Sequence, residues 1–314
     1  YEAFKTDFIN IFNDIKNHQF DWDESPLSVD GQGRLLNGAH RAAAASYLNT
    51  KVSTRTGVDI NDGQMVCDYR FFQNLGLQEN YQDAAALELA KTNKDLRVVS
   101  LFPSAENDRD LVDNLIKKSG AIAYKKDIDL NHNGAFHYML HLYKGESWAG
   151  NWNNNFSGFM AKRDVCFTSS KPLTVYLVEF DDLDDATRVK QEIRDLYKIG
   201  NHSVHINDTH EETVRVSRCV FNDNSIHFLN RAKLRYFPRF LKQLDYYTNF
   251  LDQNGLDTEE YCITASSVLS LYGLREGVDL DYLHFNNQTG SPDQTDVDYI
   301  NQTNFIGIKR PELY

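Results

Sequence analysis

Cysteine is scarce in this chain, and its spacing argues against two classes of small protein. The 314 residues contain four cysteines and no C-x-x-C pair; they are Cys67, Cys166, Cys219 and Cys262. A zinc knuckle needs closely spaced cysteine and histidine ligands, and a disulfide framework needs densely placed cysteines. The simplest expectation is a set of free, buried thiols in a reducing compartment.

Long apolar runs and a surplus of basic residues are also missing. No stretch of about 18 apolar residues is present, which argues against a membrane-spanning helix, and no signal peptide is visible. Asp and Glu number 45 against 33 Lys and Arg, so the formal net charge is −12. Nucleic acids are normally bound by a basic face, so a nucleic-acid partner is disfavoured. We expect a cytoplasmic protein, and the initial Tyr1 indicates a piece excised from a longer chain.

The remaining composition is that of an ordinary globular protein, with 41% hydrophobic and 25% charged residues. Helical periodicity alternates with strand patterns along the chain, which predicts an α/β or α+β fold. The strongest strand pattern is LTVYLVEF, over residues 173–180. A Trp-, Asn- and Gly-rich segment over 145–164 predicts a long loop, and residues 231–251 predict one helix. We place the domain boundary between residues 105 and 106, where a strand gives way to polar sequence.

A glycine, a histidine and an arginine open a predicted helix near the N-terminus. Gly38, His40 and Arg41 follow two short strand patterns separated by the turn Asp30-Gly-Gln-Gly33. Free N–H groups and the positive dipole end of a helix favour an anion at such a position. Arg41 adds a bidentate donor for phosphate. The alternative is a surface helix start in which Arg41 pairs with an acidic neighbour.

This G-x-H-R segment resembles the ParB/sulfiredoxin-like fold over roughly residues 20–60. The resemblance implies that residues 1–105 form a ParB/sulfiredoxin-like domain that binds nucleotide phosphates through Gly38, His40 and Arg41. Relatives of that fold hydrolyse nucleotides or phosphorylate serine. A kinase of this type also uses an upstream acidic base, and Asp21 lies among the acidic residues nearby.

A second motif lies near the C-terminus, where a serine pair precedes a helix and a D-x-D. Ser266 and Ser267 begin the predicted helix, and Asp279 and Asp281 alternate on the following strand, so both carboxylates project from one face. Two hard oxygen ligands suit Mg²⁺, which keeps substrate phosphates among its other ligands. Arg275 is placed to neutralise developing charge. The alternative is a pair of aspartates that face solvent at a strand end.

The serine–helix–D-x-D motif resembles polymerase-β-like nucleotidyltransferases. It implies that residues 106–314 form a nucleotidyltransferase-like mixed sheet with helices, and that Asp279 and Asp281 hold Mg²⁺ or Mn²⁺ for phosphoryl transfer. Members usually add a third aspartate, for which Asp296 and Asp298 are candidates. The family's serine pair normally opens with glycine, whereas Ala265 stands there, so an inactive, substrate-binding copy is an alternative.

Both motifs point to phosphate chemistry, and together they predict a transferase. The expected protein is a Mg²⁺-dependent phosphotransferase or nucleotidyltransferase that uses a nucleoside triphosphate or nucleotide-sugar. Its acceptor is a small metabolite or a sugar. One alternative is a glycosyltransferase that uses a nucleotide-sugar in surface glycan synthesis, because D-x-D also serves that class. Another is a nucleotide-switched or nucleic-acid-binding protein without enzymatic activity. The oligomeric state is left open.

Weaker signals lie between the two motifs. Thr209 and Glu212 have the spacing of a capping box, and His205 just precedes them. Trp148 and Trp152, in the predicted loop, either stack on a sugar or base or pack within the protein. Lys126, at the end of a predicted strand beside Lys125, is a candidate phosphate ligand or a solvated lysine.

Two histidines at helical spacing, His137 and His141, match a zinc pair but lack the H-E-x-x-H pattern. We therefore do not expect them to bind zinc.

Overall fold

The chain has a mixed α/β fold that divides into two compact units. The computed structural model describes residues 2–31, 33, 35–56, 68–106, 109–143, 145–150, 154–233, 236–284 and 297–299. The boundary between the two units lies between Cys67 and Asp68, and not between residues 105 and 106. The physical reason is that the strand over residues 96–101 pairs with strands far downstream, so the segment before residue 105 belongs to the second unit.

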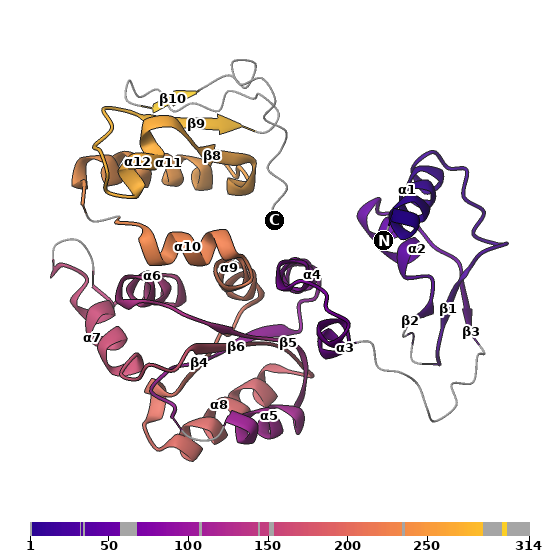
Figure 1. Ribbon diagram of the computed structural model, residues 1–314, viewed down its shortest axis with the longest axis horizontal. Coiled ribbons are helices and arrows are strands. Elements are labelled where there is room, and N and C mark those ends of the chain that lie inside the picture. Colours follow the sequence, from indigo (N-terminus) through magenta and orange to yellow (C-terminus); the bar gives the residue numbers. More distant parts are fainter. Residues whose placement is uncertain are drawn as a thin grey trace. The chain divides into compact units, whose positions relative to one another are not determined.

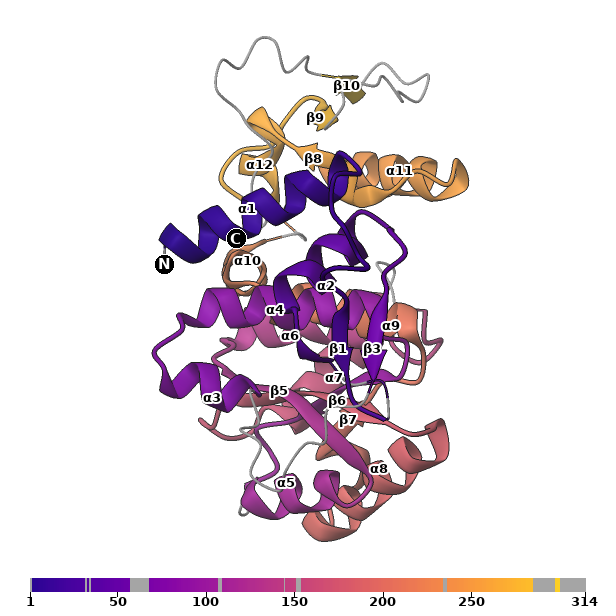
Figure 2. The ribbon, with the colours of Figure 1, turned by 90° about the vertical axis from the view of Figure 1, so that its right-hand side faces the viewer.

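The first unit is a small three-stranded sheet with two helices. Its elements are α1 (Glu2–Lys16), β1 (Leu27–Val29), β2 (Leu35–Asn37), α2 (Ala39–Tyr47) and β3 (Thr54–Thr56). β1 is central, antiparallel to β2 and parallel to β3 (Figure 1), and Figure 2 shows β3 alongside β1. Phe8 and Phe12 of α1 contact rings on α2, and Ala44 and Ala45 bury the inner side of α2.

The second unit is built on a four-stranded antiparallel sheet in the order β5-β6-β4-β7. Its strands are β4 (Leu96–Leu101), β5 (Gly120–Ile128), β6 (Leu173–Phe180) and β7 (Val204–Ile206). Helices α5 (Arg109–Lys117) and α8 (Leu183–Tyr197) connect them as β4-α5-β5 and β6-α8-β7. This order, with a central β4 and β6, is the split β-α-β arrangement called ferredoxin-like.

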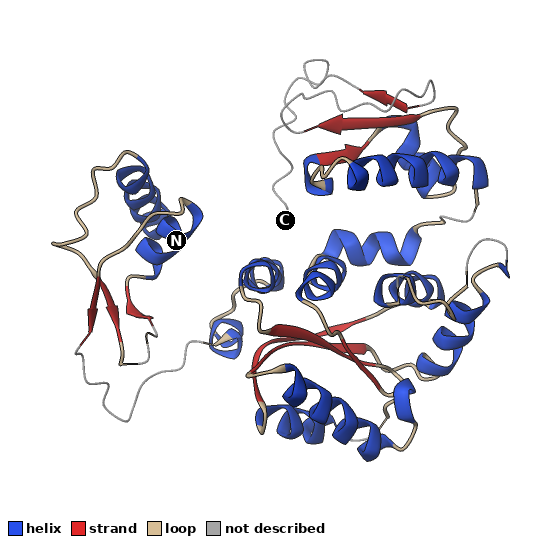
Figure 3. Ribbon diagram, turned by 180° about the vertical axis from the view of Figure 1, so that it is seen from behind, coloured by secondary structure: helices blue, strands red, loops and turns tan. Residues whose placement is uncertain are grey.

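Helices cover both faces of this sheet, which explains why β6 is buried along nearly its whole length (Figures 1 and 3). Alternate residues such as Tyr176 and Val178 pack against α5 and α8, while Val175 and Leu177 pack on the other face. That other face carries α4 (Glu79–Thr92), α6 (His132–Leu142), α7 (Ser157–Cys166), α9 (His210–Val220) and α10 (Asp223–Arg231). A two-sided cover removes the polar alternation that a half-exposed strand would display.

The C-terminal part adds a second sheet in the order β10-β9-β8. Its elements are α11 (Pro238–Gln253), β8 (Tyr261–Ile263), α12 (Ala265–Leu271), β9 (Leu280–His284) and β10 (Val297–Tyr299). Leu280 and Tyr282 of β9 are fully buried and pack against Phe240 and Tyr247 of α11. Three further short segments of the second unit are described: α3 (Tyr69–Asn74) and the 3-10 turns at 200–202 and 258–260.

Two sequence predictions about helices are wrong. The predicted loop over 145–164 contains most of α7, which forms because Phe159 and Cys166 bury one of its sides in the core. The predicted helix over 231–251 begins late, because α10 ends at Arg231 and α11 begins only at Pro238. Pro238 is the first residue of α11, and a proline disfavours helical backbone in the residue before it.

The described thiols are unpaired, as expected, although one is not buried. Cys166 and Cys219 are buried and Cys262 is exposed, while Cys67 lies outside the described residues. Within the part of the chain that the structure describes, no helix is both long and apolar enough to cross a bilayer.

Candidate functional site

The two aspartates of the D-x-D take alternate positions around a buried residue. Leu280 lies between them and is fully buried against α11. Asp279 and Asp281 are half-buried. The sequence prediction that both aspartates alternate on one strand is wrong for Asp279, which lies in the bend just before β9. Asp281 lies on β9 between the buried Leu280 and Tyr282, so strand alternation directs its position to the other face.

The serine pair is hydrogen bonded to this D-x-D. Ser266 Oγ donates to Asp281 Oδ2 at 3.2 Å. Ser267 Oγ accepts from the Asp281 N–H at 2.7 Å and donates to the Asp279 carbonyl at 3.3 Å. The structure therefore brings together four of the residues that the sequence singled out, and the start of α12 fixes the orientation of the Asp281 carboxylate.

The first residue of α12 has a left-handed backbone conformation, although it is not a glycine. Ala265 has φ +50°. This conformation crowds a Cβ against the backbone and costs roughly 1–2 kcal/mol in a residue other than glycine. The Thr264 N–H is bonded to the Asp281 carbonyl at 3.0 Å, so the turn is held against β9.

Ala265→Gly is therefore expected to stabilise the second unit. Relief of the left-handed alanine exceeds the entropic cost of glycine, which is roughly 0.5–1 kcal/mol, so the net gain is about 0.5–1 kcal/mol. Denaturant unfolding followed by circular dichroism measures it. Ala186→Gly, within helix α8, is the control and is expected to destabilise. A loss of stability in both variants would contradict the prediction.

A third aspartate has its backbone beside the D-x-D. β10 runs parallel to β9, and Asp298 is the register partner of Asp281. The side chain of Asp298 and all of Asp296 lie outside the described residues. Among the side chains that are described, no group of three or more His, Cys, Asp or Glu is placed to hold a metal ion. Within the described residues, the site therefore contains the carboxylates of Asp279 and Asp281 and the backbone of Asp298 on the neighbouring strand.

Arg275 does not join this group through its side chain. The residue is exposed, and its carbonyl accepts a hydrogen bond from Ser270 at 2.9 Å. Within the described residues, no hydrogen bond or ion pair links its guanidinium to Asp279 or Asp281. Its role in neutralising charge remains a prediction.

The G-x-H-R residues lie at the start of α2, as predicted. Gly38 precedes the helix with φ +99°, a conformation that favours glycine. Arg41 Nη1 donates to the carbonyls of Ser25 and Pro26 at 2.7 and 3.1 Å. The His40 ring packs edge-on against Phe8 of α1, with centroids 5.7 Å apart. Arg41 thus holds the chain entering β1, and its contact with phosphate remains a prediction.

Of the weaker signals, the capping box is confirmed, with Thr209 and Glu212 bonded reciprocally at the start of α9. His137 is buried, and its Nδ1 lies 2.8 Å from the Leu229 carbonyl. Trp152 lies outside the described residues.

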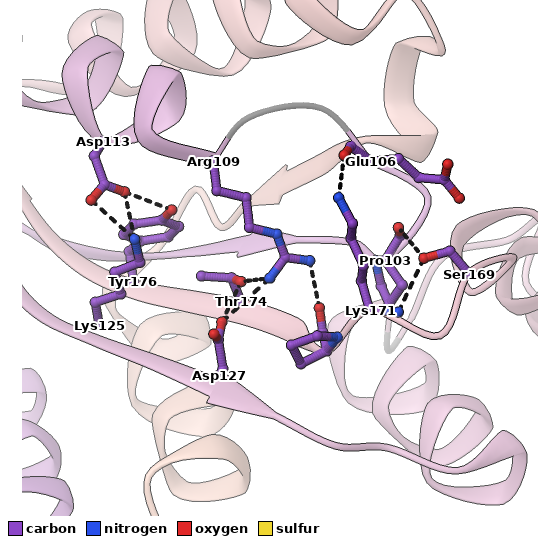
Figure 4. Close-up of polar contacts among 11 residues, drawn as sticks. Pro103, Glu106, Arg109, Asp113, Lys125, Asp127, Ser169, Lys171, Thr174 and Tyr176 are labelled. Atoms are coloured by element: carbon purple, nitrogen blue, oxygen red, sulfur yellow. Dashed lines mark hydrogen bonds and ion pairs between the residues drawn. The ribbon is translucent and has the colours of Figure 1, made fainter.

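The two lysines of β5 are paired with carboxylates. Figure 4 shows Lys125 beside Asp113 and Tyr176, and its Nζ is 2.8 Å from Asp113 Oδ1. Lys126 is buried and pairs with Asp83. Neither lysine is therefore a solvated side chain.

The fold and the site define the chain as a mixed α/β protein with two carboxylates on a strand–turn–helix–strand unit. No protein-family model matches the chain, and no curated protein matches it. Among solved structures, it is similar to a nucleoside diphosphate kinase from Halobacterium salinarum in complex with CDP. The identity is 16%, over 40% of this chain and 87% of that chain, with a TM-score of 0.27.

Proposed function

We propose that this chain is a Mg²⁺- or Mn²⁺-dependent transferase that acts on a nucleoside triphosphate or nucleotide-sugar, with its site at Asp279 and Asp281. The observation that carries the proposal is the hydrogen bonding of Ser266 and Ser267 to the D-x-D. This arrangement orients the Asp281 carboxylate before a nucleotide or a metal ion binds. Carboxylates that are already held in place favour the binding of a divalent cation. The transferred group is a phosphoryl or nucleotidyl group, and the acceptor is a small metabolite or a sugar.

In the proposed reaction, Asp279 and Asp281 would supply the anionic oxygens that hold a divalent cation. A bound divalent cation withdraws charge from the phosphoryl oxygens. Ser266 keeps Asp281 oriented, and Ser267 ties the backbone of both aspartates to α12. For nucleotidyl transfer from a nucleoside triphosphate, an acceptor hydroxyl oxygen forms a bond to the α-phosphorus while its proton passes to a nearby carboxylate. The bond from that phosphorus to the bridging oxygen breaks, and pyrophosphate leaves. The resemblance also assigns Gly38, His40 and Arg41 to phosphate binding in the first unit.

The test is a thermal-shift panel of nucleoside triphosphates and nucleotide-sugars, each with Mn²⁺ and with EDTA. We expect Mn²⁺-dependent stabilisation by at least one ligand, and about 10- to 100-fold weaker binding in Asp281→Asn and Asp279→Asn, as for loss of a site's metal-positioning groups. Glu276→Gln removes an exposed carboxylate from the same loop and is the matched control.

The products distinguish the reaction classes. Pyrophosphate release supports nucleotidyl transfer, whereas a nucleoside diphosphate together with a free sugar supports the glycosyltransferase alternative. Equal affinities in Asp281→Asn and Glu276→Gln would refute the proposed site.

A further inference from the structure

A cavity of about 330 Å³ lies beside the edge strand β7 of the second unit. Its walls come from the segment after α6, from α7 and α8, and from β7 itself. The side chains used below are Tyr143, Glu146, Trp148, Lys162, Arg194 and His205. None of them belongs to the D-x-D site, so the cavity is a separate feature.

Lys162 brings a buried positive charge to this cavity. The residue is only 8% exposed. Its Nζ donates to the Asn201 carbonyl at 2.6 Å and lies 5.8 Å from the centre of the Tyr143 ring. Burial, together with the positive charge of Arg194, lowers the pKa of the Lys162 ammonium, against the opposing effect of Cys166. No carboxylate of the described chain lies within ion-pair distance of it.

Arg194 adds a second positive charge from α8. Its Nε is buried and has no hydrogen-bond partner among the described residues. Glu146 is the carboxylate that lines the cavity, but it is exposed, and no ion pair in the described chain joins it to Lys162 or Arg194. Buried charges are normally paired, so a buried lysine beside a half-buried arginine, neither of them in an ion pair with a described residue, indicates a site for an anion.

An aromatic wall stands beside the two cations. Trp148 is 46% exposed, and its ring packs against Tyr143 with centroids 5.1 Å apart. The Tyr143 ring also contacts the ring of His205, with centroids 5.1 Å apart. A half-exposed indole that packs edge-on against another ring offers a flat apolar surface to a base or to the face of a sugar.

We propose that this cavity binds a phosphate monoester carried on a ring, either a nucleoside monophosphate or a sugar phosphate. Lys162 and Arg194 contact the phosphate, and Trp148 stacks on the ring. A phosphate monoester carries about −1.5 to −2 charges at pH 7, which matches two cations better than a single carboxylate does. The volume lies at the lower end of small-ligand sites, roughly 300–1,000 Å³, as a compact ligand requires.

Calorimetric titration with adenosine 5′-monophosphate, glucose 6-phosphate and inorganic phosphate tests this proposal. EDTA is present throughout, so that metal-dependent binding at Asp279 and Asp281 does not contribute. For each probe that binds the parent protein, we expect Arg194→Gln to weaken the affinity at least tenfold. Arg188→Gln is the matched control, because Arg188 is an exposed arginine of the same helix that pairs with Asp185.

Trp148→Ala separates the two halves of the ligand. It is expected to weaken the ring-bearing probe several-fold and to leave inorganic phosphate unchanged. The ester that binds with the higher affinity shows whether the cavity accepts a nucleoside or a sugar. The proposal fails if neither ester binds the parent protein, or if Arg194→Gln and Arg188→Gln bind equally well. Lys162→Gln is a supporting variant, and Arg194→Gln decides the test should Lys162→Gln fail to fold. If Asp281→Asn does not affect nucleotide binding, the proposed function at the D-x-D fails. The titration in EDTA still decides whether the cavity binds a phosphate monoester.

Discussion

Replacing Lys126 with methionine is expected to lower the free energy of unfolding of the second unit by about 3–5 kcal/mol. Lys126 is 5% exposed, and its partner Asp83 is 3% exposed. Without the lysine, Asp83 keeps the hydrogen bond from the Tyr124 hydroxyl at 2.9 Å but loses its counter-charge. Burial already raises the pKa of the Asp83 carboxyl with Lys126 in place. A carboxylate left alone in this environment therefore destabilises the fold.

The double variant shows whether this loss comes from an unpaired charge. Replacing the pair with Asp83→Leu and Lys126→Met together removes both charges and is expected to recover most of the stability. Lys91→Met breaks an exposed ion pair with Glu88 and is the control, with an expected cost below about 1 kcal/mol. Guanidinium unfolding followed by circular dichroism measures all three variants. If Lys126→Met lowers the free energy of unfolding no more than Lys91→Met does, then Lys126 and Asp83 do not form a buried ion pair in solution.

The same pair illustrates what the sequence does not contain. Lys125 and Lys126 are adjacent and chemically identical, and alternation places them on opposite faces of β5. Lys126 then meets Asp83, which lies 43 residues away, while Lys125 meets Asp113 on α5. Their environments depend on which helices cover each face, and this is a property of the tertiary fold.

Local signals were predictable because their causes are local. The capping box at Thr209 depends on residues three apart, and the contact between Ser266 and Asp281 follows from one strand–helix–strand connection. The position of β4 between β6 and β7 depends on pairings up to about a hundred residues apart, so the domain boundary was not readable from composition. Lys162 and Arg194 had no motif to mark them, since α7 and α8 bring them together only in the fold.

Below pH 6.5, the free energy of unfolding is expected to fall more steeply in the parent protein than in His205→Phe. Burial, with the charges of Lys190, Lys162 and Arg194, lowers the pKa of His205 to about 3, and Asp208 opposes this shift. Between pH 6.5 and about 3 the unfolded chain therefore binds a proton that the folded chain does not. Stability is lost as the pH falls, at about 1.4 kcal/mol per pH unit for one group.

Urea unfolding at pH 7, 6 and 5 measures the difference between the parent and His205→Phe, which retains a ring against Tyr143. By pH 5 the parent is expected to have lost about 2 kcal/mol more than the variant. His132→Phe, at an exposed position, controls for the removal of one imidazole. Parallel curves for the parent and His205→Phe would contradict the prediction.

Because His205 lines the cavity with Lys162 and Arg194, a bound phosphate raises the pKa of His205 and reduces the difference between the parent and the variant. Repeating the series with inorganic phosphate therefore reports on the anion site through a residue that is not proposed to bind the phosphate.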